Sequence, residues 1–294
     1  MERLSVGLVG AGPWAHLVHA PMLAGHPGTR LTGVWARRPE AAAELAAAHG
    51  TTACASFDEL LAGCQAVAFA VPPDVQATLA VTAARAGRHL LLEKPVALTL
   101  DAARALADAV DGAGVGSQVL LSWRYAAPVR DFLATVAAGG SPVGGRGAFL
   151  TGGALSGPFT TPWRLEHGPL LDLGPHVVDL LDAALGRVVG VRAHGDPLRW
   201  VGLLLEHETG AVSEASLSAN TAVQPPRAGV EVFTEAGAAD VDTGAGVGPE
   251  AFTTVVDELV RTAAGTPHPL DVHRGVHLQW VIDAALRDLR LRDR

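Results

Sequence analysis

Lys94 is the residue whose chemistry stands out most in this chain. Of the 22 lysine and arginine residues it is the only lysine, and it lies between Glu93 and Pro95, directly after a short apolar run. Arginine stays charged at any usable pH, whereas a lysine ammonium is compact and its pKa falls when it is buried. A site that needs a proton donor would prefer lysine here. A chance lysine on a solvated loop explains the count equally well.

A second set of reactive side chains follows in the later half of the chain. Asp172, His176 and Asp179 are spaced by four and three residues, so on a single helix all three share one face. A carboxylate one turn before a histidine orients the ring and raises its basicity, and histidine titrates near neutral pH. The spacing indicates an acid-base pair. It fits slightly better with a helix that Asp172 caps, that Pro175 begins, and that holds His176 in the core.

The elements before residue 121 alternate between strands and helices, which is typical of a parallel sheet with helices on both faces. Continuous apolar runs mark strands buried on both faces, and ligands bind at the carboxyl edge of such sheets. Lys94 comes directly after one of these runs, so we expect it at the ligand edge. The expected strands are 4–10, 31–35, 65–71, 88–92 and 117–121, and the expected helices are 39–49, 74–86 and 99–111.

A glycine turn follows the first expected strand. Gly10, Gly12 and Ala15 match the GxGxxA form of the dinucleotide fingerprint, in which the first glycine makes the turn and the second lets the backbone approach the pyrophosphate. The following helix offers free N–H groups to phosphate. The sequence therefore predicts that Gly10, Gly12, Pro13 and Trp14 contact a dinucleotide.

The second expected strand ends without an acidic residue. In NAD-binding proteins a carboxylate at this point binds the ribose 2′-hydroxyl. Here Ala36, Arg37 and Arg38 take its place, and two guanidinium groups suit a 2′-phosphate. We therefore expect NADP(H) to be favoured, with NAD(H) as the second candidate. The alternative is that Arg37 and Arg38 only begin the next helix as solvated charges.

The second half of the chain has a different pattern. Short strands separated by Gly, Pro and Asn turns predict a mostly antiparallel sheet. We therefore predict an α/β protein in which an N-terminal Rossmann domain (1–121), a doubly wound parallel sheet, precedes a C-terminal α+β domain (122–294) with an open sheet. The expected strands are 146–154, 188–194, 199–206, 211–220 and 229–234, and the expected helices are 128–138, 249–264 and 272–291.

Composition narrows the classes of partner. The 294 residues carry a net charge of -8 without a basic stripe, which argues against nucleic acid, and no apolar run is long enough to predict a membrane span. Cys54 and Cys64 form no CxxC pair, so we expect a reducing, cytoplasmic location. Two histidine pairs have metal-like helical spacing, but no carboxylate motif accompanies them and we expect no metal. The pairs are His16 with His19 and His273 with His277.

Four motifs, taken in order, resemble one known family. GAGPWA at 10–15, EKP at 93–95, Trp163-Arg164 and DLGPHVVD at 172–179 are similar to the glucose-fructose oxidoreductase and inositol dehydrogenase family of NAD(P)-dependent oxidoreductases. The resemblance implies an active site between the two domains. It also implies that Lys94 contacts the reacting oxygen and the nicotinamide ribose, that His176 exchanges the proton, and that Asp172 binds substrate. The resemblance further places Val71, Pro72 and Glu93 near the nicotinamide and implies a cis bond before Pro95.

The chain also departs from the family pattern. His167-Gly168-Pro169 stands where the family usually has a glycine triplet, and Gln76 stands where histidine is frequent. Four further side chains are candidates for the substrate pocket, with packing in the core or at the surface as the alternative: Arg124, Tyr125, Trp163 and Arg164.

These features together predict an NADP(H)-preferring oxidoreductase that interconverts a secondary alcohol and a ketone on a sugar, polyol or related small polar molecule. The alternative is a cofactor-binding sensor that keeps the fold without catalysis. By analogy with the family we expect a homodimer or homotetramer formed through the C-terminal sheet.

Overall fold

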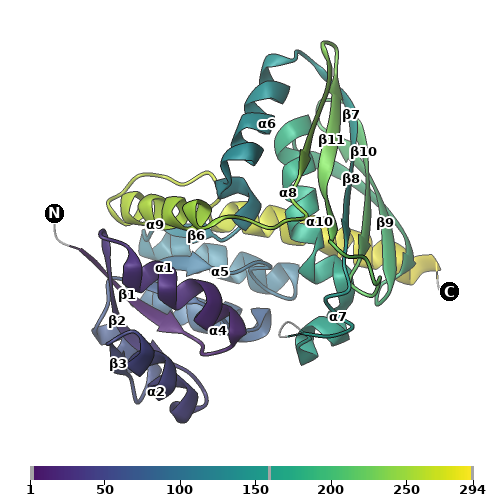
Figure 1. Cartoon of the computed structure of the whole chain (residues 1–294). Coiled ribbons are helices and arrows are strands. Elements are labelled where there is room, and N and C mark those ends of the chain that lie inside the picture. Colours follow the sequence, from purple (N-terminus) through teal and green to yellow (C-terminus); the bar gives the residue numbers. More distant parts are fainter. Residues whose placement is uncertain (1–2, 158–159, 293–294) are drawn as a thin grey trace. The chain divides into compact units, whose positions relative to one another are not determined.

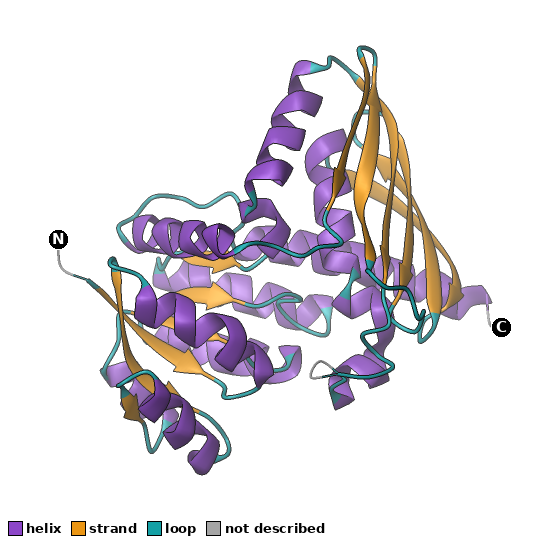
Figure 2. Cartoon of the chain, in the orientation of Figure 1, coloured by secondary structure: helices purple, strands orange, loops and turns teal. Residues whose placement is uncertain are grey.

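The structure is a computed structural model that describes residues 3–157 and 160–292. It divides into two compact units. The first unit comprises Met1–Leu120 and Phe252–His277, and the second comprises Leu121–Ala251 and Leu278–Arg294. Figure 1 labels most of the helices and strands, and Figure 2 colours them by type. The chain therefore returns to the first unit after it has formed most of the second.

The first unit is built on a parallel sheet with the strand order β3-β2-β1-β4-β5-β6. The order reverses direction between β1 and β4, which is the switch point at which ligands bind in open parallel sheets. The side chains of β4 and nearly all those of β1 and β5 are buried, as the apolar runs predicted. The strands are β1 Leu4–Val9, β2 Thr29–Trp35, β3 Thr52–Ala53, β4 Ala66–Phe69, β5 His89–Leu92 and β6 Ser117–Val119.

Helices connect these strands, and local signals fix their ends. In α5, Thr99 caps the N-terminus by accepting a hydrogen bond from the Ala102 N–H at 3.2 Å, and Gly114 ends the helix with a φ of 64°. Its leucines and valine face the core while its aspartates face away. The helices of this unit are α2 Pro39–Ala48, α3 Phe57–Ala62, α4 Pro73–Arg85 and α5 Leu100–Ala113, together with most of α9 Pro249–Ala263.

The helix that follows the glycine turn is irregular, which the sequence reading did not anticipate. A π-helical turn, η1 Ala15–His19, precedes α1 Ala20–Gly25. Proline has no N–H, so Pro21 cannot donate to the carbonyl four residues earlier. The wider turn next to it lets the Ala20 N–H donate to the Ala15 carbonyl instead. His19 lies at the end of this wide turn and is fully buried.

The second unit is built on a sheet with the order β12-β11-β7-β10-β9-β8, in which β7 and β10 pair in parallel and the other neighbours pair antiparallel. Helix α8 covers one face, because a Cβ on Gly147 would lie 2.6 Å from Val177. The predicted fold class is confirmed. The strands are β7 Pro142–Leu150, β8 Val188–Asp196, β9 Trp200–His207, β10 Val212–Ser218, β11 Arg227–Thr234 and β12 Gly237–Asp242.

Of the two interpretations of this segment, the one with Asp172, His176 and Asp179 on a single helix is wrong. The one with His176 in a helix that begins near Pro175 agrees with the structure, although Leu173 and not Asp172 is the N-cap residue. Asp172 is the last residue of α7 Pro162–Asp172, and α8 Gly174–Leu185 begins two residues later. Pro175 lies in the first turn of α8, where its missing N–H is tolerated. The remaining elements of this unit are η2 Ser122–Tyr125, α6 Ala127–Ala138 and the later part of α10 Val272–Arg292. Across residues 3–157 and 160–292, no helix is both long enough and apolar enough to cross a membrane.

Candidate active site

The glycine turn after β1 has the geometry that dinucleotide binding requires. Gly10 has a φ of 112°, and a Cβ there would lie 2.3 Å from the Ala70 carbonyl oxygen, so only glycine fits. The Gly10 N–H donates to the Trp35 carbonyl at 2.8 Å, which ties the turn to the end of β2. A Cβ on Gly12, in contrast, would meet nothing within 4 Å. The open space at Gly12 would let the pyrophosphate of a dinucleotide approach the protein main chain.

The residues after β2 lie beside this turn. Ala36 is partly buried, and the side chains of Arg37 and Arg38 are exposed. Within the described residues, neither guanidinium group makes a hydrogen bond or an ion pair with the protein. Both cations are therefore available to a ligand at the carboxyl end of β2.

The ends of β4 and β5 complete the same edge of the sheet. The Ala70 N–H donates to the Val9 carbonyl at 2.8 Å, and a Cβ on Gly10 would lie 2.9 Å from Cγ1 of Val71. Val71 therefore lies against the glycine turn, and Pro72 follows it as the N-cap residue of α4. All the predicted cofactor-binding residues follow parallel strands of this one edge, which is the arrangement the sequence predicted for them.

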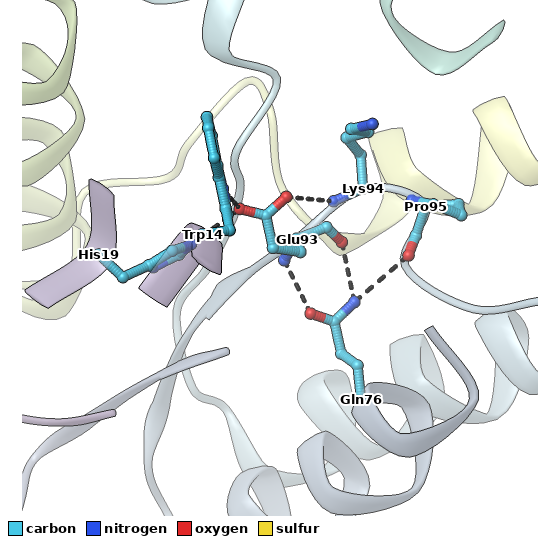
Figure 3. Close-up of polar contacts among 6 residues, drawn as sticks. All are labelled: Trp14, His19, Gln76, Glu93, Lys94 and Pro95. Atoms are coloured by element: carbon cyan, nitrogen blue, oxygen red, sulfur yellow. Dashed lines mark hydrogen bonds and ion pairs between the residues drawn. The ribbon is translucent and has the colours of Figure 1, made fainter. Parts of the chain in front are cut away.

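Glu93 connects the glycine turn to the loop that carries Lys94. Its Oε1 atom accepts hydrogen bonds from Nε1 of Trp14 at 2.6 Å and from Nε2 of His19 at 2.8 Å, and its Oε2 atom accepts from the Lys94 N–H at 3.3 Å. Figure 3 shows the carboxylate between these groups. Both carboxylate oxygens therefore accept hydrogen bonds from neighbouring groups.

Gln76 holds the main chain of the same loop. From α4 its Oε1 atom accepts from the Glu93 N–H at 2.8 Å, and its Nε2 atom donates to the Glu93 carbonyl, also at 2.8 Å. The amide also reaches the carbonyls of Pro95 and Val96 at 3.4 and 3.2 Å. A fully buried side chain thus pairs with a peptide as a neighbouring strand would.

Lys94 leaves the loop in a direction of its own. Its side chain points away from Gln76, as Figure 3 shows, while Glu93 points toward Trp14 and His19. The bond between Lys94 and Pro95 is cis, which confirms the expectation taken from the resemblance. The single lysine is therefore presented from a loop that side-chain and main-chain hydrogen bonds both fix.

In the second unit, His176 lies in an aromatic setting. Its ring centroid is 4.9 Å from that of Trp123 and 6.2 Å from that of Phe149. Trp123 belongs to η2, His176 to the first turn of α8, and Phe149 to β7. The indole lies close to parallel to the imidazole, at 31°, so it packs against one face of the ring and restricts its rotation.

Asp172 is paired with a residue of its own helix. Nε of Arg164 donates to the Asp172 carboxylate at 3.0 Å, and NH1 of Arg164 donates to Thr161 at 3.1 Å. The same guanidinium lies 4.7 Å from the ring centre of Trp163. Three of the predicted substrate-site residues are therefore joined in one cluster on α7.

Arg124 has a structural partner that the sequence did not reveal. Its guanidinium bonds both oxygens of Asp179 at 3.1 Å, and the Asp179 side chain is 1% exposed. Tyr125 is 2% exposed, and the Arg130 guanidinium lies 5.9 Å from its ring centre. The roles of Arg124 and Tyr125 toward substrate stay predictions.

The segment His167-Gly168-Pro169 contains a glycine that the backbone requires. Gly168 has a φ of 71° and a ψ of -172° inside α7. A Cβ there would lie 2.1 Å from the Pro197 carbonyl oxygen. Gly168 therefore bends α7 against the turn between β8 and β9, four residues before Asp172.

Two residues that sequence reasoning left without a role contact the candidate site. Trp123 packs on His176, and His19 bonds Glu93 across 74 positions of sequence. The sequence offered only their positions as a signal, because His19 follows the glycine motif closely and Trp123 directly precedes Arg124. His19 is also one half of the His16–His19 pair, whose spacing resembles that of metal ligands. Within the part of the chain that the structure describes, no group of three or more His, Cys, Asp or Glu side chains is arranged to hold a metal ion.

The fold and the edge of the first sheet define a dinucleotide-binding oxidoreductase, and sequence comparison agrees. Residues 4–120 match the family profile described as "Oxidoreductase family, NAD-binding Rossmann fold" (GFO_IDH_MocA). The UDP-N-acetylglucosamine 3-dehydrogenase of Acidithiobacillus ferrooxidans is 30% identical over 248 residues, which cover 82% of this chain and 75% of that protein. The chain belongs to this Gfo/Idh/MocA family of dehydrogenases and reductases.

Other relatives support the same family. The dTDP-3,4-didehydro-2,6-dideoxy-alpha-D-glucose 3-reductase of Streptomyces violaceoruber is 30% identical over 245 residues, which cover 78% of this chain and 65% of that protein. Among solved structures, GenD2 from gentamicin A biosynthesis in complex with NAD is 26% identical with a TM-score of 0.88, over 99% of this chain and 95% of that one.

Proposed function

We propose that this protein interconverts a secondary alcohol and a ketone on a sugar or polyol, with a preference for NADP(H). The observation that carries the proposal is the carboxyl edge of the first sheet. There the Gly10–Gly12 turn follows β1, two arginines with no described partner follow β2, and the loop of Lys94 follows β5. Bound nicotinamide would supply hydride transfer to or from the carbinol carbon.

Arg37 and Arg38 support the preference for NADP(H). A 2′-phosphate carries the negative charge that two unpaired guanidinium groups attract, and they follow Ala36 where a ribose-binding carboxylate would otherwise stand. Titration with NADPH and NADH side by side tests this, and replacing both arginines by alanine should weaken NADPH binding far more than NADH binding. Equal affinities in the unaltered protein, or tighter NADH, would contradict the preference.

Gly12 provides a test of the cofactor site that needs no turnover. Because a Cβ at Gly12 meets no protein atom within 4 Å, Gly12→Ala should fold normally and still weaken binding of both cofactors. Gly25 is a matched control in the same unit, since a Cβ there also meets nothing within 4 Å. Unchanged NADPH affinity in Gly12→Ala would move the pyrophosphate elsewhere.

Lys94 and His176 are proposed to handle the proton. The Lys94 ammonium would donate a hydrogen bond to the reacting oxygen. The His176 ring, held by Trp123, would exchange the hydroxyl proton with that same oxygen. Asp172, fixed by Arg164, would accept hydrogen bonds from substrate hydroxyls. Lys94→Arg should leave cofactor binding nearly intact and lower kcat by orders of magnitude, because the wider guanidinium neither fits nor releases a proton. Unchanged turnover would refute this role.

The second unit and the relatives support the proposed substrate class. The indole of Trp163 and the Arg164–Asp172 pair combine a flat apolar face with hydrogen-bonding groups, which is how proteins bind sugar rings. The two curated relatives named above act on nucleotide-linked sugars according to their names. A panel of free sugars, polyols and nucleotide sugars, followed by NADPH absorbance, would identify the substrate.

A catalytically silent sensor of the same fold is the alternative. Such a protein would bind NADPH but oxidise or reduce no member of that panel. The presence of Lys94, Asp172 and His176 together favours an enzyme, because a sensor has no need of proton-transfer groups.

We also propose that the sheet of the second unit mediates homodimer or homotetramer formation. Leu203 lies on the α8 side of the sheet, since it aligns through Ala215 with Gly147, so its neighbour Leu204 faces away from α8. Leu204 is 43% exposed, and Trp200, four residues earlier and on the same face, is also 43% exposed. Light scattering should show an oligomer that Leu204→Asp dissociates. Leu198→Asp, at a comparably exposed site outside the sheet, should not dissociate it. A monomeric parent protein would refute the proposal.

A further inference from the structure

We propose that His19 is a positioning residue for the loop of Lys94, acting through Glu93. This inference rests on the proposed role of Lys94 in proton exchange. Within the described residues, the His19 side chain makes no hydrogen bond to the loop's main chain. It fixes the carboxylate next to Lys94 in sequence, and that carboxylate in turn accepts a hydrogen bond from the Lys94 N–H.

His19 is fully buried, and the described part of the chain gives its ring one hydrogen bond. Its side chain is 0% exposed, and its Nε2 atom lies 2.8 Å from Oε1 of Glu93. The other ring nitrogen, Nδ1, is buried and has no hydrogen-bond partner among the described residues. A buried polar side chain is retained where its hydrogen bond is useful, because an unsatisfied atom destabilises the fold. In His19 the useful bond is the one to Glu93.

Glu93 is held at both of its ends. Trp14 and His19 bind the side-chain carboxylate, and Gln76 binds the N–H and the carbonyl on either side of the Glu93 Cα. Since peptide groups are planar, fixing these two groups leaves the direction of the following residue little freedom. Figure 3 shows the outcome, in which Glu93 and Lys94 project to different sides of the chain.

His19 is the part of this arrangement that can be removed with least disturbance elsewhere. Trp14 is itself a predicted cofactor contact, and Gln76 bonds four main-chain groups of the loop. Without His19 the carboxylate keeps Trp14 but loses its second donor on Oε1, so it can rotate away from the Lys94 N–H. A displacement of about 1 Å at a reacting group lowers turnover roughly 100-fold.

The test compares two amide replacements that differ only in reach. The Gln side-chain amide nitrogen takes the place of Nε2, so His19→Gln should keep the bond to Glu93. The shorter His19→Asn leaves its amide near the position of Nδ1 and cannot reach. We expect kcat of His19→Asn to fall by roughly 10- to 100-fold with nearly unchanged NADPH affinity, and His19→Gln to recover most of it. His16, in the same turn and with no described polar side-chain contact, provides the control, and His16→Asn should retain full kcat.

Three results would overturn the inference. The first is equal kcat in His19→Asn and the parent protein. The second is equal loss in the Asn and Gln variants in step with lowered Tm, which indicates a packing role only. Lys94→Arg is assayed alongside to separate the two proposals. If Lys94→Arg loses turnover while His19→Asn keeps it, only the positioning role fails. The third result is unchanged turnover in Lys94→Arg. In that case both the role of Lys94 and the inference built on it fail.

Discussion

Gly168 offers a sharp test of how the substrate side of the site is shaped. It adopts a φ of 71° and a ψ of -172°, a region of backbone conformation that is essentially confined to glycine. A Cβ at this position would also lie 2.1 Å from the carbonyl oxygen of Pro197. Gly168→Ala therefore imposes both a backbone strain and a collision with main chain, which cannot rotate away as a side chain can.

The two effects are of similar size. Holding a residue other than glycine in this region costs about 1–3 kcal/mol. Relieving the contact with Pro197 requires a main-chain shift, and such overpacking costs about 1–3 kcal/mol. The expected loss in the free energy of unfolding is therefore about 4 kcal/mol, a large part of the roughly 5–15 kcal/mol that stabilises a typical protein. The corresponding fall in Tm is on the order of 10 °C.

Urea unfolding followed by circular dichroism measures this loss, and Gly174→Ala is the matched control. Gly174 begins α8 in the same segment, has no positive φ, and would place its Cβ 3.4 Å from Leu170, which is ordinary contact. Gly174→Ala should change the free energy of unfolding by less than about 1 kcal/mol. If the two variants unfold at the same urea concentration, the strain assigned to Gly168 is absent.

Three further predictions concern single groups. Burial raises the pKa of the Cys64 thiol to about 11, so this thiol should react with an aromatic disulfide reagent only after unfolding, and prompt reaction of both cysteines in the native protein would contradict its burial. Arg124→Met leaves the buried Asp179 carboxylate without its guanidinium and should lower the free energy of unfolding by about 3 kcal/mol, while Arg124→Met with Asp179→Leu should recover most of it; equal losses would show that the ion pair is unimportant. Burial lowers the pKa of His89, so its neutral form contributes stability in full above 6.5, and that contribution is lost as the pH falls below this value; the stability difference between the parent protein and His89→Asn should shrink on acidification, and a constant difference would refute the assignment.

The sequence predicted the elements that local patterns determine. Continuous apolar runs located the strands that end at the carboxyl edge of the first sheet, because strands buried on both faces have no polar positions. It did not predict β3, since Thr52 and Ala53 are both exposed and form too short a run to read. It did not predict α7, and it left open whether Asp172 shares the helix of His176, because helical spacing continues across Leu173, whose φ and ψ remain close to helical values.

The candidate site was predicted where residue type and position in a motif coincide, as for Gly10, Gly12 and Lys94. The partners that hold those residues were not predicted. His19 and Glu93 are 74 residues apart, and Arg124 and Asp179 are 55 apart, so no periodicity within one element relates them. Such pairs follow from how whole elements pack, which a single sequence does not display.

Gln76 holds the loop of Lys94 with a group that does not titrate. A side-chain amide carries its donor and its acceptor on one edge and has no proton to gain or lose near neutral pH. Its two-point grip on the Glu93 peptide therefore has the same strength in acidic and in neutral solution. A histidine at this position would gain a second N–H on protonation and lose its acceptor. With glutamine there, the anchoring of the loop that carries Lys94 does not depend on the acidity of its surroundings.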